Sequence, residues 1–210
     1  MNYTESLAYL DSLGKFGIKL GMERIEGLLR ELGNPEQKIK TVHVTGTNGK
    51  GSVTSMITNI LLAANLKVGK FTSPHLVKYN ERINLNGKDI SDEDFATAIT
   101  AVKVAADSVV KKGVCEQPTQ FEILTAAAFL YFYLQKVDYA VIEVGMGGLW
   151  DSTNVITPVV SVITNVALDH TDRCGKTLER IAMQKAGIIK EKVPLVTAAE
   201  GNEALGPIVS

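Results

Sequence analysis

A glycine-rich segment between a strand and a helix constrains the fold of this chain more than any other feature. The segment runs from His43 to Ser52, HVTGTNGKGS; it follows a short β-branched run and precedes an apolar helical pattern. The usual phosphate loop, G-x-x-x-x-G-K-[ST], has four residues between its glycines, whereas only Thr47 and Asn48 separate Gly46 from Gly49. Two interpretations follow: a phosphate loop of another pattern, or a plain strand–helix turn.

The residue types in this segment favour the phosphate loop. Backbone N–H groups at a helix N-terminus offer hydrogen-bond donors and a partial positive charge to an anion. Glycines let that backbone approach the anion closely, and Lys50 adds a full charge for the outer phosphates. Thr47 and Ser52 each offer a hydroxyl to a metal ion. We therefore interpret the segment as a nucleotide site with tighter spacing than usual.

Strands and helices alternate along the chain, which predicts an α/β fold with a doubly wound, mostly parallel sheet and a P-loop-type nucleotide site. The apolar runs DYAVIEV and PVVSVIT are typical of strands covered on both faces. Asn86-Gly87 suits a type I′ hairpin turn, and residues 72–83 indicate an extended loop. The predicted helices are 3–13, 22–32, 52–64, 91–112, 121–134 and 177–187, with a further one starting at 202; the predicted strands are 40–44, 66–71, 138–144, 158–164 and 193–197.

Composition excludes several function classes. The net charge of −1 gives no electrostatic basis for binding nucleic acid or an anionic membrane. Cys115 and Cys174 lie far apart without metal spacing, which indicates reduced thiols in a cytoplasmic protein. The N-terminus has no basic flank typical of a signal peptide, and the apolar run 121–134 is too short to span a bilayer. We expect a cytoplasmic protein with no membrane or nucleic-acid partner.

Glu143 ends an apolar strand, so its carboxylate is expected at the carboxyl edge of the sheet. Ligands of α/β sheets bind at that edge, and nucleotide enzymes hold Mg²⁺ there beside the phosphate lysine. Taken alone, Glu143 would be an ordinary charge at a strand end. Beside the glycine-rich segment, it predicts a metal ligand.

Several other polar residues have ordinary interpretations when they are considered alone. His170 would be a histidine hydrogen-bonded in a loop, because Mg²⁺ prefers oxygen ligands. Ser73 would be a cap and His75 a surface residue. Lys185 and Lys190, on or just after a helix, would be solvated lysines.

The motifs taken together resemble a known family. HVTGTNGKGS, FTSPHLVKYNERI, FEILTAAAF, VIEVGMGG with DSTN, VALDH and QKAGIIK occur in this order and cover essentially the whole chain. The chain resembles folylpolyglutamate synthase, often bifunctional with dihydrofolate synthase, in the Mur ligase superfamily. The resemblance implies an ATP-dependent acid–amino-acid ligase. ATP would phosphorylate a carboxylate of folate or dihydropteroate, and the amine of L-glutamate would then attack the acyl phosphate.

The resemblance also implies site residues and the cofactors ATP and Mg²⁺. It implies catalytic roles for Lys50, Lys185 and His170, and it makes Lys185 a candidate for carbamylation, which would turn it into an oxygen ligand. It changes the ordinary interpretation of Ser73 and His170 to that of metal ligands. The implied ATP-binding residues are Thr47, Asn48, Gly49, Lys50, Gly51 and Ser52; the implied metal ligands are Ser73, Glu143, His170 and Ser52; the implied contacts to the pteroate substrate are Thr119, Gln120, Phe121, Glu122, Trp150, Asp151, Ser152 and, in the mobile loop 72–82, Arg82.

Some alternatives stay open. Trp150 either stacks on a pterin ring or simply covers its loop. The family's Asp-Gly-Ala-His-Asn-Pro-type motif is absent from these 210 residues. We therefore expect residues 1–210 to be a truncated N-terminal ATP-binding domain that lacks the C-terminal glutamate-binding domain and has little or no ligase activity. The family suggests a monomer. The competing functions are another Mur-type amino-acid ligase and a non-catalytic nucleotide-binding remnant.

Overall fold

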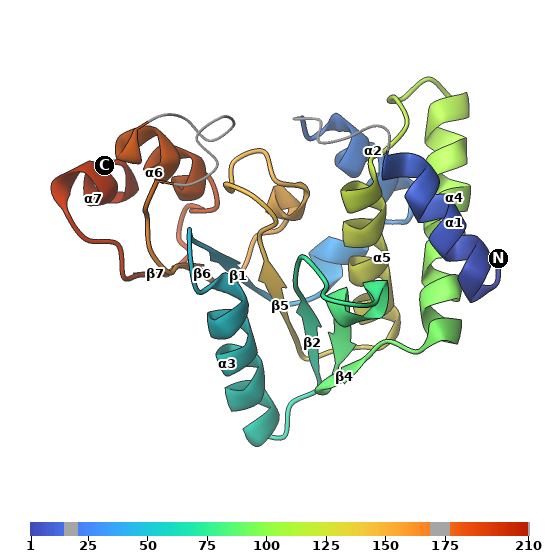
Figure 1. Cartoon of the computed structure of the whole chain (residues 1–210), viewed down its shortest axis with the longest axis horizontal. Helices are drawn as coiled ribbons and strands as arrows, with labels where there is room; N and C mark the ends of the chain where they lie inside the picture. The colour runs from blue at the N-terminus through green and yellow to red at the C-terminus, as the bar shows by residue number, and fades with distance from the viewer. Residues whose placement is uncertain (15–20, 169–176, 210) are drawn as a thin grey trace.

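The computed structural model describes residues 1–14, 21–168 and 177–209, and it contains a seven-stranded sheet flanked by helices (Figure 1). The strand order is β4-β3-β2-β5-β1-β6-β7. Neighbouring strands from β2 to β7 are parallel, whereas β3 and β4 add an antiparallel edge. This confirms the predicted fold class. The strands are β1 Thr41–Thr45, β2 Val68–Phe71, β3 Ile83–Leu85, β4 Lys88–Asp89, β5 Tyr139–Glu143, β6 Val160–Ile163 and β7 Leu195–Thr197.

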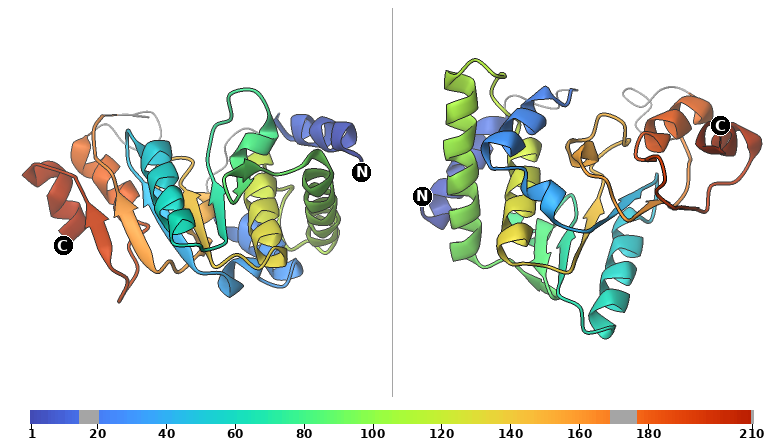
Figure 2. Two further views of the ribbon diagram at one scale, coloured as in Figure 1. Left: turned by 90° about the horizontal axis from the view of Figure 1, so that it is seen from below. Right: turned by 180° about the vertical axis from the view of Figure 1, so that it is seen from behind.

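The helices lie in layers on the two faces of this sheet. One face is covered by α3, and the other by α5, with α4 and α1 forming an outer layer beyond α5 (Figures 1 and 2). At the β7 end, α6 and α7 pack against each other. The α-helices are α1 Tyr3–Leu13, α2 Glu23–Glu31, α3 Lys50–Ala63, α4 Asp92–Lys111, α5 Gln120–Leu134, α6 Leu178–Ala186 and α7 Asn202–Val209; the short 3-10 helices are η2 Pro35–Lys38, η3 Tyr79–Arg82 and η4 Ser152–Val155. None of the described helices is long and apolar enough to cross a membrane.

The central strand β1 has two different buried faces. Val42 and Val44 join Val141 and α3 in one apolar core. The alternate residues Thr41, His43 and Thr45 are also buried, and they point to the opposite face because side chains alternate along a strand. A fully polar buried row is unusual and requires hydrogen-bond partners. For His43 and Thr45 these partners lie in the segment after β5, whereas Thr41 Oγ1 has no partner among the described residues.

Strand β5 confirms the prediction from its continuous apolar run. Ala140 and Ile142 pack into the large core formed with α5, while Val141 packs toward α3. Parallel pairing places Glu143 opposite Val44 of β1. The strand therefore delivers the Glu143 carboxylate to the edge of the sheet from which α3 begins.

The predicted caps and hairpin are confirmed. Ser91 accepts a hydrogen bond from Asp94 N at the start of α4. Thr119 and Glu122 form a reciprocal capping box at the start of α5. Asn86 and Gly87 have φ angles of 51° and 79°, as a type I′ turn requires.

The segment expected to be an extended loop is more ordered than predicted. Its last part forms η3, because the Glu81 carboxylate accepts hydrogen bonds from the backbone N–H groups of Leu76, Val77 and Lys78. These bonds turn the chain back on itself and lower the pKa of Glu81. Sequence periodicity gave no sign of this internal cap.

A buried ion pair joins α2 to α5. Arg24 Nε lies 3.0 Å from Glu122 Oε1 and 3.1 Å from Oε2, and the two side chains are 9% and 2% exposed. Glu122 also accepts a hydrogen bond of 2.6 Å from Thr119 N. One carboxylate thus caps α5 and balances the charge of Arg24.

Candidate functional site

The glycine-rich segment forms a tight turn between β1 and α3. Gly46 has a φ of 154° and Gly49 a φ of 79°. A Cβ added to Gly46 would lie 1.8 Å from Thr164 Oγ1, so a side chain does not fit there. Helix α3 then begins at Lys50, earlier than predicted, without a side-chain cap. Its first N–H groups therefore remain available to an anion.

Lys50 is held within this loop. Its Nζ donates to the carbonyl oxygens of Gly46 at 3.0 Å and Thr47 at 3.2 Å. These bonds keep the ammonium group over the turn instead of extended into solvent. An anion bound at the start of α3 would therefore meet a positive charge that is already in position.

The segment after β6 braces the loop from the other side. Thr47 Oγ1 donates to Ala167 O at 3.1 Å and accepts from Ala167 N at 3.0 Å. Asn48 N donates to Asn165 Oδ1, and Thr164 Oγ1 donates to Asn48 O at 2.6 Å. The loop is thus preorganised by residues that lie more than a hundred positions away in sequence.

Glu143 and Ser73, which the resemblance implies as two metal ligands, lie side by side near the loop. Ser73 N donates to Glu143 Oε2 at 3.2 Å, and Gly51 lies against the same carboxylate. Burial raises the pKa of Glu143, while the Ser73 N–H and the charges of Lys50 and Lys70 oppose that rise. The Glu143 carboxylate is therefore only partly compensated by its protein neighbours.

This set of donors fits Mg²⁺. The Glu143 carboxylate and the Ser73 hydroxyl are oxygen donors, which Mg²⁺ prefers, and a cation would offset the burial of the Glu143 charge. Ser52 lies exposed in the first turn of α3. Among residues 1–14, 21–168 and 177–209, no three His, Cys, Asp or Glu side chains group to hold a metal ion. His170, the remaining predicted ligand, lies outside the described residues.

Lys185 is buried, which corrects its interpretation from residue type alone. Its side chain lies near the end of α6 and is 4% exposed. The helix end packs tightly on the loop after β5: Leu149 N donates to Gln184 O, and a Cβ on Gly187 would lie 2.4 Å from Leu149 Cα. Close packing, more than the helix C-cap, therefore requires glycine at 187, where φ is −57°.

Lys190 is also less exposed than a surface lysine. It is half-buried, its Nζ donates to Asn154 O at 3.5 Å, and burial lowers its pKa. It lies on the side of β1 that carries the polar row, and its charge helps to lower the pKa of His43. Lys190 therefore lies partly buried near His43, not on the open surface.

The predicted substrate segments come together near the loop after β5. Phe121 contacts Gly145, where an added Cβ would lie 2.6 Å from the ring. Asp151 is buried, and its carboxylate accepts from Met146 N and Thr153 N. Trp150 is 47% exposed and Ser152 is half-buried. Gln120 is half-buried as well, whereas Thr119 and Glu122 are buried in the capping box.

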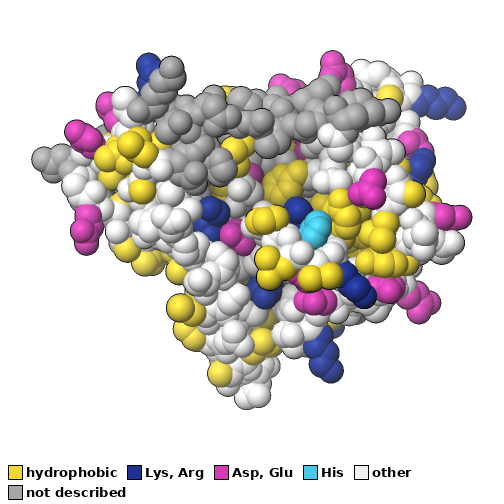
Figure 3. All heavy atoms as spheres, viewed as in Figure 1, with side chains coloured by type: hydrophobic (Ala, Val, Ile, Leu, Met, Phe, Trp, Pro, Cys, Tyr) yellow, Lys and Arg dark blue, Asp and Glu magenta, His cyan; other side chains and the backbone are white. Residues whose placement is uncertain are grey.

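Arg82 lies in the loop at residues 72–82 and is ordered by it. Its Nε donates to His75 Nδ1 at 2.8 Å, and its guanidinium lies 5.8 Å from the Tyr79 ring centroid. His75 is therefore half-buried, not a free surface residue. Leu76 and Val77 stay exposed at 92% and 82%, and Figure 3 shows hydrophobic side chains gathered near the middle of the face that it presents.

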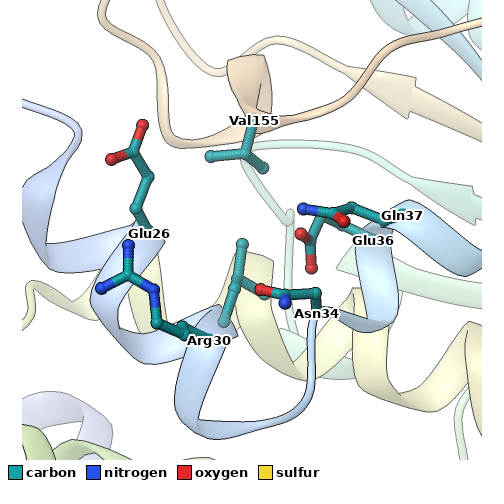
Figure 4. A pocket seen from close by; sticks show the side chains of 7 residues that line it. Glu26, Arg30, Asn34, Glu36, Gln37 and Val155 are labelled. Carbon is teal, nitrogen blue, oxygen red and sulfur yellow. The ribbon is translucent and has the colours of Figure 1, made fainter.

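A separate cavity of about 270 Å³ lies where α2 ends, between η2 and η4 (Figure 4). Its lining contains none of the predicted site residues. Glu36 is buried there, and among the described residues its Oε2 has no hydrogen-bond partner. Burial raises the pKa of Glu36. The cavity is lined by Glu26, Leu29, Arg30, Asn34, Glu36, Gln37 and Val155.

Replacing Glu36 should make stability less dependent on pH. Because the folded-state pKa is raised, the stability contribution of Glu36 is present below about pH 4.5 and is lost as the pH rises through the folded value. We expect Glu36→Gln to raise the melting temperature at pH 8 by about 2 °C, a small effect because hydrogen bonds from Glu36 N and Gln37 and the charge of Lys38 oppose the effect of burial. At pH 4 we expect no gain. Glu26→Gln, an exposed carboxylate in the same cavity, is the control, and an equal gain at both pH values would contradict the account.

Comparison with known proteins places this site in a family. The model of the Mur ligase middle domain matches residues 44–200, which include the phosphate loop, Ser73, Glu143 and Lys185. The chain belongs to the Mur ligase family. Within this family it is 47% identical over 206 residues to a dihydrofolate synthase/folylpolyglutamate synthase of Bacillus subtilis, covering 97% of the chain and 47% of the relative.

Solved structures of Mur ligase relatives agree with the fold. The apo form of Lacticaseibacillus casei FPGS (folylpolyglutamate synthase) superposes with a TM-score of 0.94 at 45% identity, covering 99% of this chain and 51% of that one. An FPGS–AMPPCP–folate complex superposes with a TM-score of 0.92 at 45% identity, with coverages of 99% and 51%. The chain spans about half the length of the relatives it matches.

Sequence reasoning missed the β1 residues that hydrogen-bond to the segment after β5. Thr45 Oγ1 donates to Gly147 O at 2.7 Å, and His43 Nε2 lies 2.8 Å from Thr153 Oγ1. The signal was present in the sequence, because TVHVT alternates polar and apolar residues in a strand with a neighbour on each side. Thr164 and Asn165, which brace the loop, follow β6 and carried no recognisable pattern.

Proposed function

We propose that this chain is the ATP-binding part of a ligase that joins L-glutamate to a carboxylate of folate or dihydropteroate. The observation that carries the proposal is the preorganised phosphate loop with Lys50 beside Glu143 and Ser73, in a chain of the Mur ligase family. The similarity to FPGS in complex with AMPPCP and folate supports a folate-type acceptor. The identity of the acceptor, folate or dihydropteroate, belongs to the proposal.

In the proposed reaction, the phosphate loop holds ATP and the acceptor carboxylate attacks its γ-phosphorus. This forms an acyl phosphate and releases ADP. The amine of L-glutamate then attacks the acyl carbon, and phosphate leaves as the amide bond forms. Catalysis of phosphoryl transfer is mostly positioning and neutralisation of charge, so the residues of this chain act chiefly by orienting anions.

Each residue of the site has a task in this scheme. The N–H groups of Gly49 to Gly51 and the Lys50 ammonium bind the phosphates, while Thr47 and Asn48 shape the turn through their bonds to Ala167 and Asn165. Glu143 and Ser73, with Ser52 and His170, would hold Mg²⁺, which supplies charge neutralisation between the two anions. Lys185, buried at the end of α6, is proposed as a carbamylated residue that adds oxygen donors to the same region.

The acceptor would lie along the loop after β5. We propose that Phe121, Trp150, Asp151 and Ser152 contact its pteroate part, with Gln120 and Arg82 at the margin. Thr119 and Glu122 would contribute through the helix cap that they form, because both are buried. Exclusion of water from this region would protect the acyl phosphate from hydrolysis.

We further propose that the protein acts as a monomer in the cytoplasm, and that residues 1–210 on their own have little or no ligase activity. The ligase claim is tested with a protein that carries this chain at the full length of its relatives. Incorporation of labelled glutamate is measured with ATP and with dihydropteroate, tetrahydrofolate or a muramyl acceptor. We expect turnover of a pteroate-type acceptor, and turnover of the muramyl acceptor alone would refute the folate assignment.

A further inference from the structure

His43 lies on the polar face of β1, three residues before Gly46, and is fully buried. Its Nε2 lies 2.8 Å from Thr153 Oγ1. The buried face of a central strand is a costly place for an imidazole unless hydrogen bonds replace the lost water. The hydrogen bond to Thr153 Oγ1 therefore indicates the structural role of the His43 ring.

The hydrogen bonds around Thr153 set the direction of this contact. Thr153 Oγ1 lies 2.5 Å from Asp151 Oδ1, which also accepts from Thr153 N at 3.0 Å. The other carboxylate oxygen, Oδ2, accepts from Met146 N at 2.9 Å. Burial raises the pKa of Asp151, and the hydrogen bonds from Thr153, Met146 and Gly145 oppose that rise. As an ionised carboxylate, Asp151 accepts the Thr153 hydroxyl proton as well. The Thr153 oxygen is then left to accept a proton from His43.

His43 is accordingly a neutral ring protonated at Nε2. Among the described residues, its Nδ1 has no hydrogen-bond partner, as expected for the unprotonated nitrogen. Burial, and the charge of Lys190, lower the pKa of His43 to about 3, so the ring stays neutral at physiological pH. The donor chain runs from His43 Nε2–H to the Thr153 hydroxyl and on to the Asp151 carboxylate.

The same strand makes a second contact with this loop. Thr45, two residues after His43 and on the same face, donates to Gly147 O at 2.7 Å. Strand β1 therefore carries the phosphate loop at its end and holds the loop from Gly145 to Asp151 through its buried polar face. The nucleotide side and the proposed acceptor side of the site share one rigid element.

We propose that His43 is a positioning residue which, through Thr153, fixes the Asp151 carboxylate and the loop of the acceptor site. Its link to acceptor binding rests on the proposed function. The hydrogen-bond chain itself does not, because it is defined by contacts within the described residues. His43 contacts neither the nucleotide nor the acceptor in this scheme, so it is not a catalytic residue.

Two variants of His43 separate the effect of its Nε2–H donor from the effect of the ring's volume. His43→Gln offers a side-chain N–H in place of Nε2–H, whereas His43→Leu fills the space without a donor. In the wild-type chain, long-range ¹H–¹⁵N spectra should show the Nε2–H tautomer. Amide exchange of Met146 and Thr153 should be about tenfold faster in His43→Leu and within about threefold of wild type in His43→Gln. The amide of Ile99, buried inside α4 and away from β1, serves as the internal control.

Ligand binding gives the functional readout. We expect His43→Leu to weaken binding of dihydropteroate about tenfold while the affinity for AMPPCP changes less than threefold, and His43→Gln to restore dihydropteroate binding. An Nδ1–H tautomer, or unchanged exchange of Met146 and Thr153 in His43→Leu, would overturn the hydrogen-bond chain. Equal weakening of both ligands would overturn the positioning role. If wild type bound no pteroate compound, the proposed function would fail while the tautomer and exchange results still decided the chain.

Discussion

Gly46→Ala is expected to abolish measurable ATP binding and to destabilise the chain by about 2–3 kcal/mol. The new Cβ would lie 1.8 Å from Thr164 Oγ1 and 3.2 Å from Thr164 N, at a residue whose φ is 154°. Thr164 cannot turn away freely, because its hydroxyl donates to Asn48 O. Relief of the clash therefore displaces the loop, and the N–H groups no longer converge on a phosphate.

This effect is measured by urea unfolding and by calorimetric titration with AMPPCP. Gly14→Ala is the matched control, because no atom of the described residues lies within 4 Å of its added Cβ. Gly46→Ala combined with Thr164→Ala removes the nearest clashing atom and should recover part of the stability. A Gly46→Ala chain with wild-type stability and affinity would show that the loop does not have the conformation described.

Arg24→Met should cost about 3–5 kcal/mol of unfolding free energy, the largest effect on stability that we expect. It would leave the Glu122 carboxylate, on a side chain that is 2% exposed, without the guanidinium that lies 3.0 Å away. Removing one partner of a buried ion pair is far more damaging than removing both. The double variant Arg24→Met/Glu122→Gln should therefore recover most of the loss, since the amide oxygen still accepts from Thr119 N.

An exposed ion pair provides the comparison. Lys112 Nζ lies 2.8 Å from Glu31 Oε1, with side chains 56% and 31% exposed. Lys112→Ala should change the unfolding free energy by less than about 1 kcal/mol. If Arg24→Met were as mild as Lys112→Ala, the Arg24–Glu122 contact would not be a structural link between α2 and α5.

The sequence predicted the fold well wherever a local rule sufficed. Apolar runs identified β5 and β6, and Ser91 and Thr119 marked helix starts, because a cap depends on residues three positions apart. Residues that act across the fold were not predictable in this way. Glu81 closes its loop through three backbone N–H groups, and Arg24 pairs with a residue 98 positions away. Neither partner follows from periodicity.

The candidate site shows the same division. Glu143 and Ser73 were predicted and do meet, because parallel strands end at one edge of the sheet. Lys185 looked like a surface lysine from its helical position, but it is buried where Gly187 and Gly148 pack closely against their neighbours. His43 was part of the quoted motif without a role, because its partner Thr153 is 110 residues away.

Calorimetric titration of AMPPCP with Mg²⁺ into the wild-type and Lys50→Ala chains tests the central claim, that Gly46 to Ser52 form an ATP site. Lys88→Ala, an exposed lysine on β4, is the control for loss of charge. We expect saturable binding at one site for wild type and Lys88→Ala. For Lys50→Ala we expect binding about 10–100-fold weaker, as loss of a charged phosphate contact of about 1.5–3 kcal/mol implies. Equal affinity in the wild-type and Lys50→Ala chains would contradict the assignment.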